Sequence, residues 1–145
     1  MMAANEVISM ANDLITLNKN RVTGYKEILH QAKDGIIAAH CHAMIQEGEK
    51  NIKDLAKIIE EAGGSVEDKT TTSGFIYNLW MDIVYSDEKE PEQDVYDYCR
   101  RMEQTALTAY EALLPQIKEE TVHLIAEHQR EQIRASLHAI DEWLK

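Results

Sequence analysis

The chain is poor in the residues that interrupt helices and in the residue that crosslinks small folds. Its 145 residues include six glycines, two prolines and two cysteines, Cys41 and Cys99. Two cysteines without a Cys-x-x-Cys spacing are too few for the disulfide framework of a secreted domain. The composition therefore predicts reduced thiols, a cytoplasmic location and a single domain, 1–145, long enough to fold on a hydrophobic core alone.

Long apolar runs and an excess of positive charge are lacking too. No stretch approaches the ~20 apolar residues of a membrane-spanning helix. The N-terminus has no basic region followed by an apolar one, as a secretory signal would have. Against 26 acidic residues stand 15 basic ones, for a formal charge of -11. Because such a surface repels phosphate backbones and anionic lipids, we expect no nucleic-acid partner and no membrane contact.

What the chain does contain is apolar residues at helical spacing. Between residues 5 and 33 one stripe of a helix, at ~100° per residue, collects the apolar side chains. These are Val7, Ala11, Leu14, Val22, Tyr25, Leu29 and Ala32. Asn18 and Arg21 fall at the midpoint of the same stripe. The pattern predicts a long helix whose buried face carries polar groups, which then need hydrogen-bond partners.

The few glycines and prolines mark the ends of further helices. Asp34 is a helix-capping residue, Gly63 suits a left-handed helix end, and Pro91 and Pro115 suit first helical turns. The predicted long helices cover about 5–33, 34–62, 92–114 and 116–144. Ser73 can cap a short helix over 74–85, in the long link between the second and third of these.

The connections predict how the helices are arranged. Tight turns join the first helix to the second and the third to the fourth, whereas a link of roughly 30 residues in the middle can run the length of a bundle. The predicted fold is all-α: an antiparallel four-helix bundle of ferritin-like type, with two helical hairpins joined by a long crossover that contains a short helix.

Three stretches resemble a known family. They are LITLNKNRVTGYKEILHQAKD, SGFIYNLWMDI and MEQTALTAYEALLP. In their order and spacing they resemble an uncharacterised bacterial four-helix-bundle family, a domain of unknown function within the ferritin-like superfamily. The resemblance implies a ferritin-like bundle and no established reaction.

Two Glu-x-x-His strings suggest a di-iron site, since ferritin-like di-metal proteins carry this motif on two helices. The strings run from Glu27 to His30 and from Glu120 to His123. Helical phase argues against the site, because Glu27 lies roughly 180° and Glu120 roughly 160° from the apolar stripe of its helix. We therefore predict that both strings lie on solvated faces.

A different polar set is predicted to face inward at one level. It comprises Asn18, Arg21, Asn51, Glu103 and Gln129. Amides and a guanidinium are not ligands for iron, so we interpret the set as a structural polar core with an Arg21–Glu103 ion pair at its centre. In the alternative, Arg21 and Glu103 extend to the surface and contribute little. A zinc site at Cys41, Cys99, His40 and His138 has permitted ligand types but no supporting spacing.

Two functions of different class follow. The first is a non-catalytic ferritin-like bundle without cofactor, which acts through self-association, as in a homodimer, or through a protein partner. The second is a metal-dependent ferritin-like oxidase or iron-binding protein, for which His40, Glu47 and Glu103 at the margins of the stripe would be the metal ligands.

Overall fold

Four long α-helices and one 3-10 turn make up the computed structural model, which describes residues 4–31, 34–67 and 91–143. They are α1 (Ala4–Gln31), α2 (Gly35–Glu61), α4 (Pro91–Leu113), η1 (Leu114–Gln116) and α5 (Glu120–Trp143). The prediction of an all-α chain with four long helices is confirmed, and the described ranges contain no strand. The short helix predicted over 74–85 lies outside them. None of the helices in these ranges is long and apolar enough to cross a lipid bilayer.

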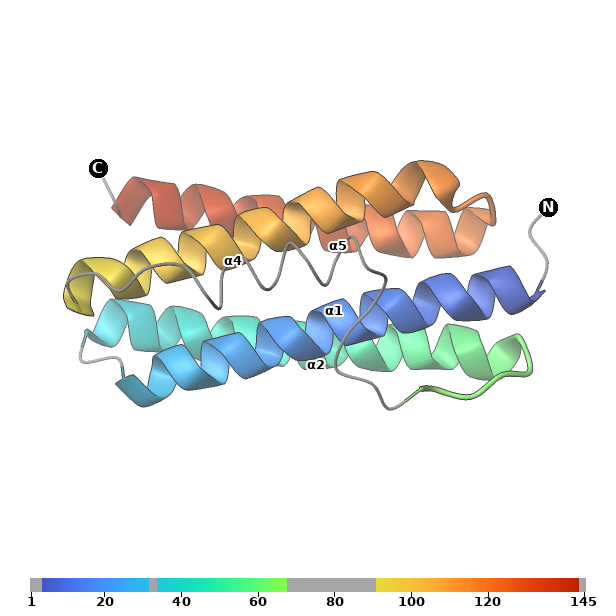
Figure 1. The fold of residues 1–145 in the computed structure, drawn as a ribbon, viewed down its shortest axis with the longest axis horizontal. Helices are drawn as coiled ribbons and strands as arrows, with labels where there is room; N and C mark the ends of the chain where they lie inside the picture. The colour runs from blue at the N-terminus through green and yellow to red at the C-terminus, as the bar shows by residue number, and fades with distance from the viewer. Residues whose placement is uncertain (1–3, 32–33, 68–90, 144–145) are drawn as a thin grey trace.

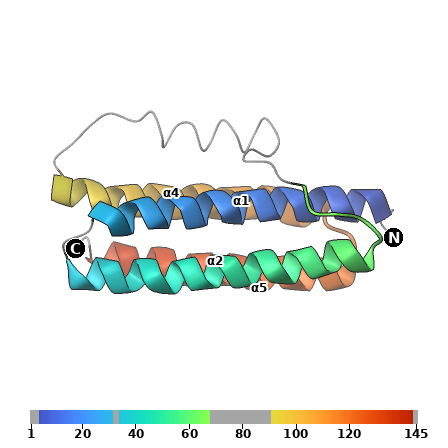
Figure 2. The same cartoon turned by 90° about the horizontal axis from the view of Figure 1, so that it is seen from below.

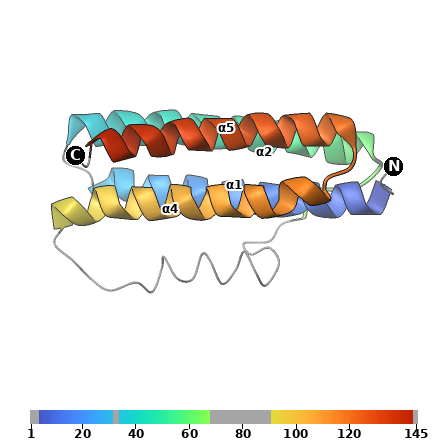
Figure 3. The same cartoon turned by 90° about the horizontal axis from the view of Figure 1, so that it is seen from above.

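The four helices lie side by side along one axis. α1 and α2 lie next to each other, as do α4 and α5 (Figure 1). The views turned by 90° place α1 beside α4 and α2 beside α5 (Figures 2 and 3). Each helix therefore has two neighbours, and α1 is diagonal to α5. Side-chain pairs show that α1 and α4 run in opposite directions, since Asn18 contacts Tyr110 and the later Arg21 contacts the earlier Glu103.

Local interactions fix both ends of α2. At its start, the Asp34 carboxylate accepts a hydrogen bond from the backbone N–H of Ile36 at 2.8 Å, which satisfies one of the free donors of the first turn. At its end Gly63 has φ +84°, the left-handed conformation that glycine adopts without steric cost. The Gly64 N–H then donates to the Ile59 carbonyl at 2.9 Å. Both caps agree with the predicted boundaries.

The start of the last helix differs from the prediction. Pro115 was expected to open a helix at 116, but it lies within η1, and α5 begins at Glu120. Ile117 is extended, with φ -87° and ψ 103°, which ends the 3-10 turn. The Glu119 carboxylate accepts from the N–H of Val122 at 2.8 Å. A capping carboxylate thus sets this boundary, in place of the proline that precedes it.

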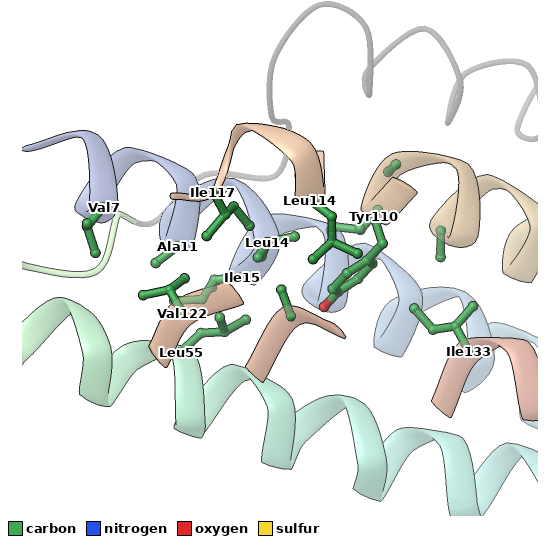
Figure 4. Close-up of a cluster of buried hydrophobic side chains, with 14 of the residues drawn as sticks. Val7, Ala11, Leu14, Ile15, Leu55, Tyr110, Leu114, Ile117, Val122 and Ile133 are labelled. Atoms are coloured by element: carbon green, nitrogen blue, oxygen red, sulfur yellow. The ribbon is translucent and has the colours of Figure 1, made fainter. Parts of the chain in front are cut away.

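The apolar core has two parts. The larger one lies toward the N-terminal half of α1 and includes Leu14, Leu55, Tyr110 and Ile133, which point into the same interior (Figure 4). The smaller one lies at the other end and is built by Tyr25, Ile28, Ile37, Cys41, Cys99, Met102 and Ile140. Along α1 the first part ends at Leu17 and the second begins at Tyr25. On α1, the buried polar residues Asn18 and Arg21 lie between the two parts.

Helix α1 is the most enclosed of the four. Its residues from Leu14 to Asn18 are all buried, five in succession, so no face of the helix is open to solvent at that level. Nearby, the side chain of Asn12 accepts from the N–H of Glu67 at 2.8 Å and donates to the Ser65 carbonyl at 3.4 Å. These two hydrogen bonds hold residues 65–67, which follow α2, against α1.

Glycine allows α1 and α2 to approach closely. A Cβ atom built on Gly48 would lie 2.5 Å from Cγ2 of Val22, nearer than real Cβ contacts come. Gly48 is on the buried face of α2, and the close approach of the helices explains why a side chain is absent there.

Candidate functional site

Arg21 lies in the middle of the bundle with none of its surface exposed. Its Nε donates to Oε1 of Glu103 at 2.6 Å, and its Nη2 donates to Oε2 of the same carboxylate at 2.9 Å. Both side chains are 0% exposed. This is the two-pronged geometry in which guanidinium and carboxylate bind most strongly. The alternative, in which both side chains extend to the surface, is wrong.

Further groups from α1 and α2 surround the guanidinium. Nη2 of Arg21 also donates to Oε1 of Glu47 at 3.1 Å and to the sulfur of Met44 at 3.2 Å. The Cζ atom lies 5.7 Å from the centre of the Tyr25 ring. The Glu47 side chain is 19% exposed, so the ion-pair cluster reaches solvent at this edge. The guanidinium of Arg21 therefore donates hydrogen bonds to two carboxylates, those of Glu103 and Glu47.

These neighbours keep Arg21 charged. Burial alone would lower the pKa of the guanidinium, because it disfavours the charged form. The charge and hydrogen bonds of Glu103, with smaller effects of Tyr25 and Glu47, outweigh burial and raise the pKa above its ordinary value. The centre of the bundle therefore carries a permanent positive charge supplied by the protein itself.

A second polar network lies one turn away and links all four helices. Asn18 of α1 donates from Nδ2 to the hydroxyl of Tyr110 at 2.9 Å, and that hydroxyl donates to Oε1 of Gln129 at 2.5 Å. Nδ2 of Asn51 in α2 donates to Oδ1 of Asn18 at 3.3 Å. Burial raises the pKa of the Tyr110 hydroxyl, so the phenol stays protonated and can donate.

The five residues predicted for the polar core are all buried, and the structure places them in these two networks. Arg21 and Glu103 belong to the first, and Asn18, Asn51 and Gln129 to the second.

Two members were not predicted as part of this core. Tyr110 was not in the predicted set, and Glu47 was placed only among the marginal residues of the alternative metal site. The sequence does hold a signal for each, because Tyr110 lies seven residues after Glu103 and Glu47 four before Asn51, spacings that share a helix face. Ser136 is also buried and lies seven residues after Gln129, so the two residues share a face of α5.

The two Glu-x-x-His strings lie at the surface. Glu27, His30 and Glu120 are exposed, and the side chain of His123 is 38% exposed. Nε2 of His123 is 3.9 Å from the carboxylate of Glu127 on its own helix. Helical phase thus places the strings as the structure does, away from the bundle interior.

The residues considered as metal ligands do not share one centre. Nε2 of His40 is 3.2 Å from the Ser136 hydroxyl and 3.4 Å from that of Tyr25. Its ring also meets that of Trp143 edge to face, with centroids 4.9 Å apart. Glu47 and Glu103 instead bind Arg21. Within the described ranges no group of three or more His, Cys, Asp or Glu side chains is arranged to hold a metal ion.

The two cysteines are free and fully buried in the smaller apolar cluster. Burial raises the pKa of the Cys41 thiol to about 11. It raises the pKa of Cys99 further, with added effects of Cys41 and Glu103. Both thiols are therefore neutral near pH 7, where they pack as small apolar side chains. His138, the remaining residue of the zinc hypothesis, is exposed on α5.

A known protein family matches most of the chain. The family described as a domain of unknown function, DUF2383, matches residues 6–116. The chain belongs to the DUF2383 family. The match covers α1, α2 and α4, and so includes Arg21, Glu47 and Glu103. No curated protein and no solved structure matches the chain.

Proposed function

We propose that this DUF2383 chain is a non-catalytic ferritin-like helical bundle that acts through self-association or through a protein partner. The observation that carries the proposal is the guanidinium of Arg21, held by Glu103 and Glu47 at the centre of the four helices. In ferritin-like di-metal proteins the bundle core holds metal ions, bound by Glu and His side chains from facing helices. Here a charged side chain takes that place.

The order of the helices supports the ferritin-like assignment. α1 pairs with α2 and α4 pairs with α5 as adjacent hairpins, while α2 ends and α4 begins at opposite ends of the bundle (Figure 1). Two hairpins that require one long connection are the ferritin-like arrangement, whereas a simple up-and-down bundle needs only short loops.

The hydrogen-bonding chemistry of Arg21 and Glu103 also favours a structural role for the centre of the bundle. A guanidinium has only donors and stays protonated, so it cannot ligate a cation and repels one. Both oxygens of Glu103 already accept hydrogen bonds from Arg21. For the rival function, iron binding or oxidation, His40, Glu47 and Glu103 would have to leave their present partners and converge.

Metal binding separates the two functions. We expect purified protein to show no stoichiometric binding of Fe(II) or Mn(II) in calorimetric titrations, and no acceleration of Fe(II) oxidation by air. Arg21→Ala and Arg21→Gln leave two carboxylates without their cation, so both variants should bind Mn(II) more tightly than the parent. Arg100→Ala, which removes an exposed arginine of α4, is the matched control. Stoichiometric iron in the parent protein, with faster oxidation, would overturn the proposal.

Self-association is measured separately. Light scattering behind size-exclusion chromatography gives the mass of the particle over a range of protein concentrations. A mass that rises with concentration toward a closed oligomer supports self-association. A constant monomer mass contradicts it and leaves a different protein partner as the remaining alternative.

A further inference from the structure

Two buried hydrogen-bond donors at the centre of the bundle have no acceptor among the residues that the structure describes. They are Nη1 of Arg21 and Nε2 of Gln129. The two side chains are 0% and 1% exposed. A buried donor without a partner is rare in proteins, because it loses its bonds to solvent and gains none, and the loss is greater for a charged group. A third buried atom of this kind, Oε1 of Gln132, belongs to a half-exposed side chain.

The two donors belong to one polar layer. Arg21 is on α1 and Gln129 on α5, and these two helices are diagonal in the bundle (Figures 2 and 3). Asn18 lies one turn from Arg21 on α1 and connects through the Tyr110 hydroxyl to Gln129. Two hydrogen bonds thus join the turn next to Arg21 to the amide that carries the second donor.

Charge and hydrogen-bonding capacity restrict the ligand. Because both free groups are donors, the ligand must accept hydrogen bonds, which excludes a metal cation or an ammonium ion. The single charge of Arg21 already faces two carboxylates, Glu103 and Glu47, so a further anion would be repelled. A small neutral oxygen acceptor satisfies both conditions, and water is the one that protein interiors commonly hold.

We propose that Arg21 Nη1 and Gln129 Nε2 are each a binding site for an ordered water molecule, which accepts a hydrogen bond from the donor. At Arg21 the water completes the hydrogen bonds of the guanidinium, whose Nε and Nη2 bind carboxylates. The polar layer is then a hydrated one. The proposal does not depend on the proposed function, since either a structural or a metal-binding bundle could contain it.

Nuclear magnetic resonance of the whole protein tests both sites. Rotating-frame Overhauser experiments filtered on ¹⁵N should show cross-peaks to water for the Nη1 protons of Arg21 and the Nε2 protons of Gln129. The internal control is Nε of Arg21, whose proton is bound to Oε1 of the buried Glu103 carboxylate, a group without exchangeable protons. It should show none. Tyr110→Phe removes the hydroxyl, whose proton exchanges with solvent, and the Arg21 cross-peak should remain in that variant.

Two results overturn the proposal. Absence of a water cross-peak at Arg21 Nη1 would mean that no water occupies that site. Crystals grown in sodium bromide provide the second test, because an anomalous peak beside either donor would show that the ligand there is an anion. A spherical density peak within about 3 Å of each donor, without anomalous signal, supports water.

Discussion

At the scale of single residues, the molecule contains two kinds of ion pair. Arg21 and Glu103 are joined by two hydrogen bonds and are wholly buried. Arg100 and Asp141 lie 2.7 Å apart, but their side chains are 47% and 42% exposed. Water solvates the second pair whether or not it forms, whereas each member of the first depends on the other for its stability in the interior.

Breaking the buried pair should therefore be costly. Arg21→Met leaves the Glu103 carboxylate without its main partner, and we expect the free energy of unfolding to fall by ~3 to 5 kcal/mol in urea titrations. The double variant Arg21→Met/Glu103→Leu removes both charges and should recover most of this loss. Arg100→Met is the control, with an expected change of about 0 to 1 kcal/mol. An Arg21→Met variant as stable as the parent would contradict the role assigned to the pair.

His40 should make stability depend on pH. Burial lowers its pKa, Glu103 opposes the shift, and Arg21 adds to it. Because the native pKa lies below the ordinary value of about 6.5, the unfolded chain binds a proton first as pH falls. The contribution of His40 is thus intact above about pH 6.5 and decreases as pH falls toward the native pKa.

Urea unfolding at pH 8 and at pH 5.5 measures this effect. His40→Gln should lose less stability between the two pH values than the parent protein does. His42→Gln changes an exposed histidine two residues away and should behave like the parent. Equal pH dependence of the two variants would refute the assignment to His40.

At the scale of helices, sequence periodicity predicted which faces are buried, but not every helix end or contact. The 3.6-residue period sufficed to place Arg21 inside and Glu27 outside, because phase along a regular helix is fixed by residue number. The start of α5 was missed because the Glu119 cap competes with the signal of Pro115. The bond from Tyr110 to Gln129 depends on how two helices pack, which no local pattern contains.

Gly48 offers a test of helix packing. Alanine is normally better than glycine inside a helix by ~1 kcal/mol. In Gly48→Ala the new methyl group would collide with Val22 of α1, whose short branched side chain cannot turn away freely. Overpacking costs ~1 to 3 kcal/mol, so after the gain in helix propensity we expect a net loss of about 0 to 2 kcal/mol in chemical unfolding.

Gly35→Ala is the matched control, at the first position of α2. A Cβ there meets no heavy atom within 4 Å. This variant should be as stable as the parent or slightly more so. If both alanine variants gain stability, the close approach of α1 and α2 at Gly48 is not tight in solution.

At the scale of the whole molecule, charge is the dominant property. A formal charge of -11 on 145 residues gives mutual repulsion that opposes compaction. The exposed ion pairs, such as Lys50 with Asp54, offset little of this repulsion, since each stabilises the fold by about 0 to 1 kcal/mol. The bundle is therefore stabilised by its two apolar clusters against an unfavourable electrostatic background.

Salt should then stabilise the fold. We expect the melting temperature to rise when sodium chloride is increased from about 0.02 to 0.3 M, because the screening length falls below the width of the bundle. The exposed residue Glu60 provides the control variant, since Glu60→Lys changes the formal charge from -11 to -9 and should reduce the salt effect. A melting temperature that falls with added salt would show that attractive surface pairs dominate instead.

The enclosure of α1 has a consequence for the order in which the molecule opens. Because all five residues from Leu14 to Asn18 are buried, fraying at either end of the bundle leaves their backbone protons inaccessible to solvent. Deuterium should enter these five amides last, and only when the entire chain unravels. Their exchange rate would then report the global stability of the protein directly.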